Sequence, residues 1–257
     1  MELPLFPLNT VLCPGIALPL HVFEDRYRAM VRHCLESSSP FGIVLIRQGR
    51  EVGTGAISFT GIGTIAEIRD AGTYDDGRYD LLVVGTRRFE IRRVLSGRRP
   101  YLVAEVDLLA ETVGDDEVAH RLAMTATRRF VTYLELLQPR SGETADEIDV
   151  RVEVETADDD EPEDASDADE PGTQPASGEA PGRTRRVAIP DDPTVLSYLL
   201  AGILQIEAPR RQALLEADTT ERRLRVLLSL IDRENLLLRR RLRFFRPEAR
   251  MAGPRRS

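Results

Sequence analysis

The sequence predicts an α+β protein in which a β-rich lobe with one helix is followed by a helical lobe. From Met1 to about Leu109, short apolar or alternating runs are separated by Gly, Pro and Asp, which is typical of strands and turns. From Asp115 onward the apolar residues repeat with the period of a helix. An acidic run of low hydrophobicity interrupts the helical part and is expected to be disordered. The predicted division is residues 1–110 for the β-rich lobe, 111–140 and 188–246 for the helical lobe, 141–187 for the acidic insert and 247–257 for a basic tail.

In the β-rich lobe, the apolar run of residues 42–47 predicts a buried strand, and residues 61–69 alternate between apolar and small or polar side chains. The pair Asp76-Gly77 favours a tight turn, so we expect a hairpin that continues into a strand at residues 79–84. Further strands are expected at residues 88–91 and 101–108.

One helix is expected within this lobe, between Glu24 and Glu36. Its apolar residues recur at helical spacing and would face a core: Tyr27, Met30, Val31, Cys34 and Leu35. This position explains Cys34 better as a small buried hydrophobe than as a nucleophile.

The helical lobe begins with a helix at residues 115–137, which Pro139 and Gly142 should end. A second helix should start at Asp192-Pro193, a cap followed by proline, and end before Pro209. A short helix is expected at residues 211–216. The sequence Asp218-Thr-Thr-Glu221 has the pattern of a capping box that opens a long helix. These helices should pack together across the insert, so removing about residues 143–187 should leave the fold intact.

Composition excludes several enzyme classes. All 35 Lys+Arg residues are arginine. Without lysine the chain cannot build a Walker A phosphate loop, a Schiff base or a Ser-Lys dyad. The histidines and cysteines lack zinc-site spacing, even if Cys13, His21, His33 and Cys34 are taken together. We therefore expect no catalytic residues, no metal and no cofactor.

The chain also lacks an apolar run of the roughly 20 residues that a membrane-spanning helix needs. Its first residues do not form a signal peptide, because no basic region precedes an apolar block. These observations predict a cytoplasmic protein without a membrane partner.

Charge is unevenly distributed. Residues 143–179 contain sixteen acidic residues and one Arg, so the net charge of −8 leaves about +7 for the rest of the chain. The carboxyl-terminal end is rich in arginine, and it could bind nucleic acid or another anionic surface, or the tethered acidic insert itself. The arginines of this carboxyl-terminal end are Arg239, Arg240, Arg241, Arg243, Arg246, Arg250, Arg255 and Arg256.

A second alternative function for the chain is an enzyme with a carboxylate or thiol in a pocket between the lobes.

Several short stretches in both lobes carry a resemblance to one protein family. In the β-rich part these are residues 3–8, 11–15, 18–20, 23–28, 55–57, 61–66, 84–91 and 101–106. In the helical part they are residues 197–200, 212–216 and 220–224, with Leu227 and Leu228. Together these stretches resemble the amino-terminal domain of Lon proteases, over roughly residues 1–138 and 188–235.

The resemblance implies a β-rich pseudo-barrel lobe followed by a helical bundle, and a domain that engages substrate proteins without hydrolysing peptide bonds or ATP. Too little chain follows residue 235 for an ATPase or protease domain, so we expect a stand-alone bacterial member of the family. The expected function is polypeptide recognition, as an adaptor or quality-control accessory. Its expected partners are polypeptide clients, or a protease or chaperone.

Recognition of exposed polypeptide segments needs accessible apolar side chains flanked by charge. The alternative for each candidate is a structural role, with the aromatic residues in the core and the arginine in an ion pair. The candidate binding residues are Pro14, Phe23, Tyr27, Arg87 and Phe89.

Overall fold

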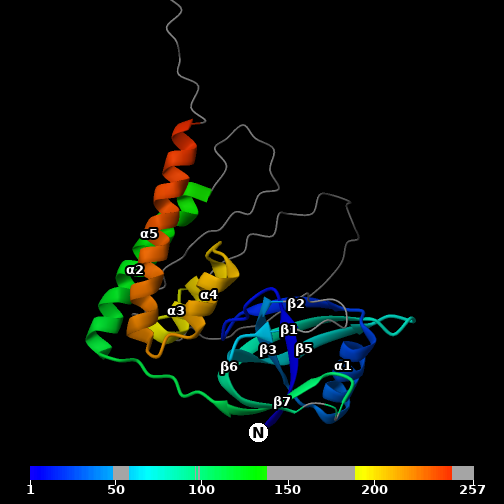
Figure 1. Ribbon diagram of the computed structural model, residues 1–257. Helices are drawn as coiled ribbons and strands as arrows, with labels where there is room; N and C mark the ends of the chain where they lie inside the picture. The colour runs from blue at the N-terminus through cyan, green and yellow to red at the C-terminus, as the bar shows by residue number, and fades with distance from the viewer. Residues whose placement is uncertain (49–57, 96, 98, 138–188, 245–257) are drawn as a thin grey trace, which may run out of the picture.

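The computed structural model describes residues 1–48, 58–95, 97, 99–137 and 189–244 (Figure 1). The predicted insert at 141–187 and the basic tail at 247–257 lie outside these residues. The described elements are, in chain order, β1 (Glu2–Leu8), β2 (Ala17–Val22), α1 (Asp25–Ser37), β3 (Phe41–Gln48), β4 (Ser58–Phe59), β5 (Ile62–Thr73), β6 (Tyr79–Leu95), β7 (Leu102–Leu108), α2 (Asp116–Leu137), α3 (Pro193–Ile203), α4 (Ala208–Leu215) and α5 (Thr220–Phe244). The predicted α+β class, with a β-rich lobe before a helical lobe, is confirmed.

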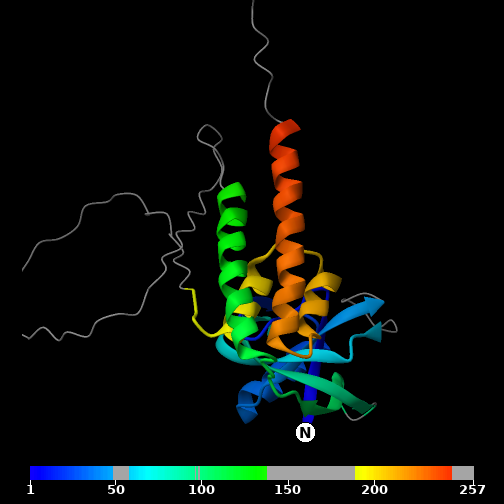
Figure 2. The same ribbon diagram turned by 90° about the vertical axis from the view of Figure 1, so that its left-hand side faces the viewer.

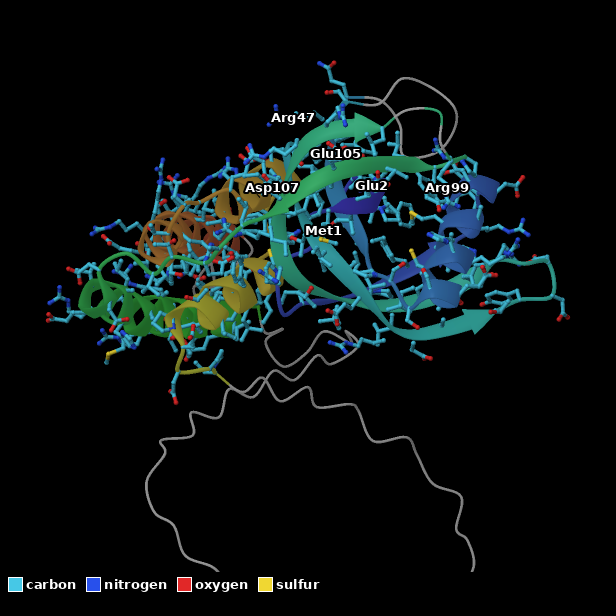
Figure 3. The ribbon with its side chains drawn as sticks, turned by 90° about the horizontal axis from the view of Figure 1, so that it is seen from below. Met1, Glu2, Arg47, Arg99, Glu105 and Asp107 are labelled. Atoms are coloured by element: carbon cyan, nitrogen blue, oxygen red, sulfur yellow. The ribbon has the colours of Figure 1, made fainter. Side chains whose placement is uncertain are left out.

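The β lobe is a sheet that closes on itself. Its strand order is β1-β7-β6-β5-β3-β4, and β1 also pairs in parallel with β3. Seen from below, Glu2 of β1 lies beside Glu105 of β7, its antiparallel partner, and the amino group of Met1 donates to the carbonyl of Val106 at 2.9 Å (Figure 3). Because the sheet closes, β1 is hydrogen-bonded to β3 on one side and to β7 on the other, so it has no free edge. The β2 strand lies off this ring and pairs with β6.

The predicted hairpin joins β5 to β6. Gly77 adopts the left-handed conformation at φ 81°, which glycine accommodates without strain. Arg28 of α1 fastens the turn, because its Nε donates to the carbonyl of Gly77 and its Nη2 to that of Asp76, both at 2.8 Å. The two runs expected at 79–84 and 88–91 form one continuous strand. Gly85 between them exchanges hydrogen bonds with the loop before β2 and does not make a turn.

Helix α1 packs on the β lobe through the face predicted from its sequence. Tyr27, Met30, Val31 and Cys34 are buried there, whereas Leu35 at the edge of the stripe is exposed. Burial raises the pKa of the Cys34 thiol and outweighs the opposing hydrogen bond with Ser39. The helix therefore closes the barrel core with a protonated, packed cysteine.

In the helical lobe, α2 and α5 run side by side in the same direction, and α3 and α4 lie between their lower halves and the β lobe (Figures 1 and 2). Asp192 caps α3 as predicted, since its Oδ1 accepts from the backbone N–H groups of Thr194 at 2.7 Å and Val195 at 3.0 Å. Among the residues described, none of these helices is long and apolar enough to cross a membrane.

Two helix boundaries differ from the prediction. Pro209 does not end α3, which stops at Ile203; it lies in the first turn of α4, where a missing N–H is tolerated. The cap of α5 is Thr219, whose hydroxyl accepts from the N–H of Arg222 at 3.1 Å. Glu221 does not complete a capping box, because its Oε2 accepts from the N–H of Asp115 at 3.1 Å and so ties α5 to the start of α2.

The two lobes share a hydrophobic core. The buried residues of the four carboxyl-terminal helices form one cluster, and Val11, Cys13 and Leu45 of the β lobe belong to it. A second cluster fills the barrel on the side of α1. Because one core crosses the junction, the lobes pack as one body and the surface between them has a defined shape.

Candidate functional site

A pocket of about 310 Å³ opens where the β lobe meets the helical lobe. Its walls come from the loop before β2, the middle of β6, the segment after β7 and the first turns of α3. The lining residues are Pro14, Gly15, Thr86, Arg87, Leu109, Ala110, Glu111, Thr194, Val195 and Tyr198.

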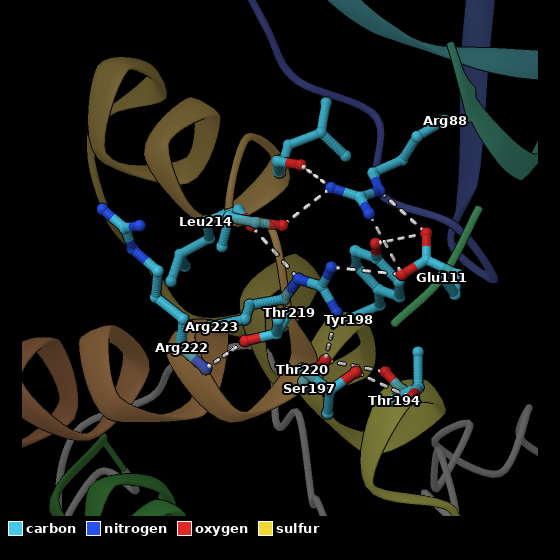
Figure 4. Close-up of polar contacts among 12 residues, drawn as sticks. Arg88, Glu111, Thr194, Ser197, Tyr198, Leu214, Thr219, Thr220, Arg222 and Arg223 are labelled. Carbon is cyan, nitrogen blue, oxygen red and sulfur yellow. Dashed lines mark hydrogen bonds and ion pairs between the residues drawn. The ribbon is translucent and has the colours of Figure 1, made fainter. Parts of the chain in front are cut away.

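Glu111 forms the polar base of this pocket and accepts four hydrogen bonds from three side chains (Figure 4). Its Oε1 accepts from Arg88 Nε at 2.7 Å and from the Tyr198 hydroxyl at 2.8 Å. Its Oε2 accepts from Arg88 Nη2 at 3.3 Å and from Arg223 Nη2 at 3.2 Å. Arg88 comes from β6 and Arg223 from α5, so one carboxylate connects both lobes.

Both guanidinium groups are buried, and their remaining donors reach backbone or hydroxyl oxygens. Arg88 Nη1 donates to the carbonyls of Leu215 and Ala217, each at 2.8 Å. Arg223 Nε donates to the carbonyl of Leu214 at 3.2 Å and Nη1 to Ser197 Oγ at 3.1 Å; the same guanidinium stacks 3.8 Å above the ring of Tyr198. The charges are thus paired and hydrogen-bonded, as buried charges must be.

The protonation states at the base of the pocket follow from these contacts. Burial alone would raise the pKa of Glu111, but the hydrogen bonds from Arg88 and Tyr198 and the charges of Arg88 and Arg223 outweigh it, and the pKa is lowered. Burial raises the pKa of Tyr198, against the opposing charges of the two arginines. Near neutral pH the carboxyl is ionised and the phenol is neutral, so neither pKa is near the value that proton transfer favours.

The rim of the pocket combines apolar and cationic side chains. Pro14 is half-buried, Val195 is 52% exposed and Arg87 is exposed. Arg87 forms no ion pair or side-chain hydrogen bond with any residue of the described chain. Its charge is therefore accessible from the solvent beside an apolar wall.

The family model of the ATP-dependent protease La (LON) substrate-binding domain matches residues 2–233 of the chain. The chain belongs to this family. Among curated LON relatives, Lon protease of Anaeromyxobacter dehalogenans is 28% identical over 137 residues, which is 52% of this chain and 16% of that protein. Lon protease 2 of Myxococcus xanthus is 31% identical over 117 residues, or 45% of this chain and 14% of that protein. The matched part thus spans about a sixth of these relatives' length.

Two solved structures share the fold of this LON substrate-binding domain. The Lon N-terminal domain protein from Xanthomonas campestris superimposes with a TM-score of 0.52 at 24% identity, covering 89% of this chain and 98% of that one. The N-terminal domain of Mycobacterium avium complex Lon protease gives a TM-score of 0.52 at 20% identity, covering 90% and 98%. The predicted resemblance to Lon amino-terminal domains is confirmed.

The structure separates the five residues that the sequence suggested for binding in this LON domain. Pro14 and Arg87 line the same pocket. Phe23 is 48% exposed but lies at the far end of β2 from Pro14. Tyr27 and Phe89 are buried, which leaves them no surface for a bound polypeptide.

Phe23 belongs to a separate aromatic patch at the end of β2. The rings of His21 and Phe23 stack with centroids 6.1 Å apart, and Tyr74 meets His21 edge-on at 6.2 Å. Asp80 accepts from His21 Nδ1 at 2.6 Å and from the Tyr74 hydroxyl at 2.5 Å. Sequence reasoning missed Tyr74 here, because the hairpin brings it beside residues about fifty positions away.

Sequence patterns also offered no sign of Glu111, Val195 and Tyr198 in the pocket. Glu111 and Tyr198 are 87 residues apart along the chain, and no motif joins them. The zinc-ligand set considered from the sequence is divided, since Cys13 lies in the shared core and Cys34 in the barrel core. Within the described ranges, no three His, Cys, Asp or Glu side chains gather as metal ligands would.

Proposed function

We propose that this chain is a non-catalytic module that binds polypeptide segments in the pocket between its lobes. The observation that carries the proposal is the pocket itself, which has apolar walls, an accessible arginine at its rim and a fixed polar base. Membership of a substrate-binding family supports a role in substrate recognition. A cytoplasmic quality-control accessory, or an adaptor for a protease or chaperone, is the cellular role that fits this activity.

The chemistry of the pocket suggests which segments it would take. Its volume of about 310 Å³ suits one or two apolar side chains rather than a folded surface. Pro14, Leu109 and Val195 offer apolar contacts, and Arg87 can donate to a backbone carbonyl or a carboxylate. We therefore expect preference for apolar side chains next to an acidic residue or a free carboxyl terminus.

Binding without catalysis is the better fit for the polar base. Glu111 and Tyr198 hydrogen-bond to each other, and Glu111 is also held by two arginines. A general base would need a free lone pair and a pKa nearer to neutrality. The hydrogen bonds of Glu111 and Tyr198 therefore support a structural role for these two residues at the base of the pocket.

The test is binding of a fluorescein-labelled unfolded protein, reduced and carboxymethylated α-lactalbumin, measured by fluorescence anisotropy. Val195→Asp should weaken binding at least about tenfold, equivalent to ~1.4 kcal/mol, because a carboxylate replaces an apolar contact beside the segment's acidic residue. The substituted residue lies in the first turn of α3, where a negative charge favours the helix, so the fold should persist. Arg87→Glu should weaken binding in the same assay.

Met124→Asp is the matched control, because Met124 is 65% exposed on α2 and does not line the pocket. It should bind as the unaltered protein does. Unchanged binding by Val195→Asp would refute the pocket. A loss confined to Phe23→Asp would also contradict it and would place binding on the aromatic patch.

A further inference from the structure

We propose that residues 146–161 of this chain dock on the distal end of α5, at a surface formed by Leu236, Leu237, Arg239, Arg240 and Arg241. We call this surface the Arg-Leu end. The inference is independent of the polypeptide pocket, which is lined by residues of the β lobe and of the first turns of α3 and by none of the Arg-Leu end.

The parallel arrangement of α2 and α5 brings the two parts together. Asp115 contacts Glu221 near the bases of the helices, and Arg129 contacts Asp232 and Asn235 farther along. These pairs are 103 to 106 residues apart in sequence, so Leu137, the last residue of α2, stands level with about Arg240. The end of α2 at Leu137 therefore lies beside the Arg-Leu end, and α5 extends beyond the end of α2 (Figure 2).

The Arg-Leu end combines arginines that form no ion pair in the described residues with leucines that are exposed. Arg239, Arg240 and Arg241 are exposed, and none forms an ion pair within the part of the chain that the structure describes. Leu236 and Leu237, one turn earlier, are also exposed. Three other exposed arginines nearer the base of the helices, Arg121, Arg222 and Arg225, each pair with a carboxylate four residues away. Arg128 and Arg233 are exposed without an ion pair in the described residues, but they do not form a run of three as the arginines of the Arg-Leu end do.

The sequence after α2 is complementary to the Arg-Leu end in charge and, like it, contains apolar residues. In residues 148–155 the apolar residues Ile148, Val150, Val152 and Val154 alternate with Asp149, Arg151, Glu153 and Glu155, and residues 158–161 are all acidic. In an extended conformation such a segment presents an apolar side and a charged side. The apolar side can cover Leu236 and Leu237 while the carboxylates pair with the arginines.

The tether favours this contact over binding in trans. Ten residues separate Leu137 from Ile148, and even a partly extended stretch of that length reaches tens of ångströms, at about 3.3 Å per residue. A segment tethered so closely has an effective concentration of the order of millimolar. A nucleic acid that uses the same arginines would have to displace it, so the docked segment would act as an internal competitor for anionic partners.

The experiment uses the full chain with Thr156→Cys carrying a nitroxide, and measures paramagnetic broadening of backbone amide signals. The native cysteines are buried, so the label should attach to the introduced thiol. At low salt, the amides from Leu236 to Arg241 should lose most of their intensity. At about 1 M salt, where the Debye length is about 3 Å, much of that intensity should return.

Two variants test the two halves of the contact. Broadening should disappear in R239Q/R240Q/R241Q, which removes the positive charges. It should weaken in V152N/V154N, which leaves the charge of the segment unchanged and removes two of its four alternating apolar residues. The matched control R121Q/R222Q/R225Q loses the same charge elsewhere and should keep the broadening. Broadening that is absent from the unaltered protein, or that persists in R239Q/R240Q/R241Q, would overturn the proposal.

Discussion

At the residue scale, two glycines make room for the fully buried ring of Phe89. A Cβ on Gly63 would lie 2.4 Å from the carbonyl oxygen of Ile43 and 2.7 Å from the ring of Phe89. A Cβ on Gly42 would lie 2.6 Å from the same ring. The aromatic ring and the small residues opposite it are complementary parts of one packing site, which explains why Phe89 is structural rather than a binding residue.

This packing predicts that Gly63→Ala destabilises the protein by about 1–3 kcal/mol, because the rigid backbone of β3 cannot move away from the new methyl group. Urea unfolding followed by circular dichroism would measure the change. Gly61→Ala is the matched control, since nothing lies within 4 Å of a Cβ there. Equal effects of the two substitutions would contradict the packing explanation.

The thiols also reflect their surroundings. Burial raises the pKa of Cys13 to about 11, although Arg211 and Arg223 oppose the shift. Since the thiolate is the reactive form, both cysteines of the native protein should react slowly with Ellman's reagent at pH 8 and quickly in denaturant. Rapid reaction of either thiol in the folded protein would revive the idea of a thiol enzyme.

At the element scale, α3 depends on a cap that the sequence reveals. Replacing Asp192 with Ala removes the acceptor for two backbone N–H groups and should cost about 1 kcal/mol of stability. Thermal or urea unfolding would measure it. Asp191→Ala removes the same charge one residue earlier, where no cap bond is made, and should have little effect. A loss of similar size in both variants would show that charge, rather than capping, stabilises the helix.

The start of α5 illustrates how tertiary contact alters a local pattern. The sequence suggests that Glu221 should bond back to its own helix, yet its carboxylate reaches the N–H of Asp115 and the guanidinium of Arg225. The N–H of Thr220 donates to the carbonyl of Thr112 at 2.8 Å. Residues 112–115 supply these partners. The cap of α5 is therefore Thr219 rather than Asp218, and this one-residue shift satisfies more of the backbone groups at the start of the helix.

At the scale of the whole molecule, Glu111 is the charge that both lobes share. Glu111→Gln would leave Arg88 and Arg223 buried without a counter-charge, and should cost roughly 3 kcal/mol at pH 7. Because the folded-state pKa of Glu111 is lowered, its contribution is present above the ordinary value of about 4.5 and is lost as the pH falls through the folded value. The stability gap between the unaltered protein and the variant should therefore narrow in acid.

Urea unfolding at pH 7 and at several values below 4.5 would test this dependence. The control is Glu117→Gln, which removes a carboxylate from an exposed pair with Arg121 and should cost less than about 1 kcal/mol. If the difference in the free energy of unfolding between the unaltered protein and Glu111→Gln stayed constant on acidification, the Glu111 carboxylate would not have the lowered pKa that its surroundings give it.

Deletion of residues 143–187 should preserve the fold. Ten residues would still connect Leu137 to Pro193, and they can span about 33 Å, roughly the length of α2. Loop-closure entropy changes only slowly with loop length, so the melting temperature should move little. A loss of cooperative unfolding in the deletion variant would show that the insert contributes to the core.

Features that depend on near neighbours could be predicted from the amino-acid sequence. Hydrophobic spacing located α1 and its buried face, the Asp76-Gly77 pair located the hairpin, and Asp192-Pro193 located the start of α3. Several stretches, of which the first runs from Leu3 to Arg28, indicated the family. Of the candidate site, the sequence suggested Pro14 and Arg87, which the pocket contains.

Contacts between residues far apart in the sequence could not be predicted and became visible in the folded chain. The parallel pairing of β1 with β3 closes the barrel, and Glu111 contacts Arg223 across 112 residues of sequence. Closure and packing then decide exposure: they bury Tyr27 and Phe89 and leave Phe23 and Val195 accessible. The physical reason is that period and capping report contacts within a few residues, whereas burial and charge pairing depend on the packing of the whole chain.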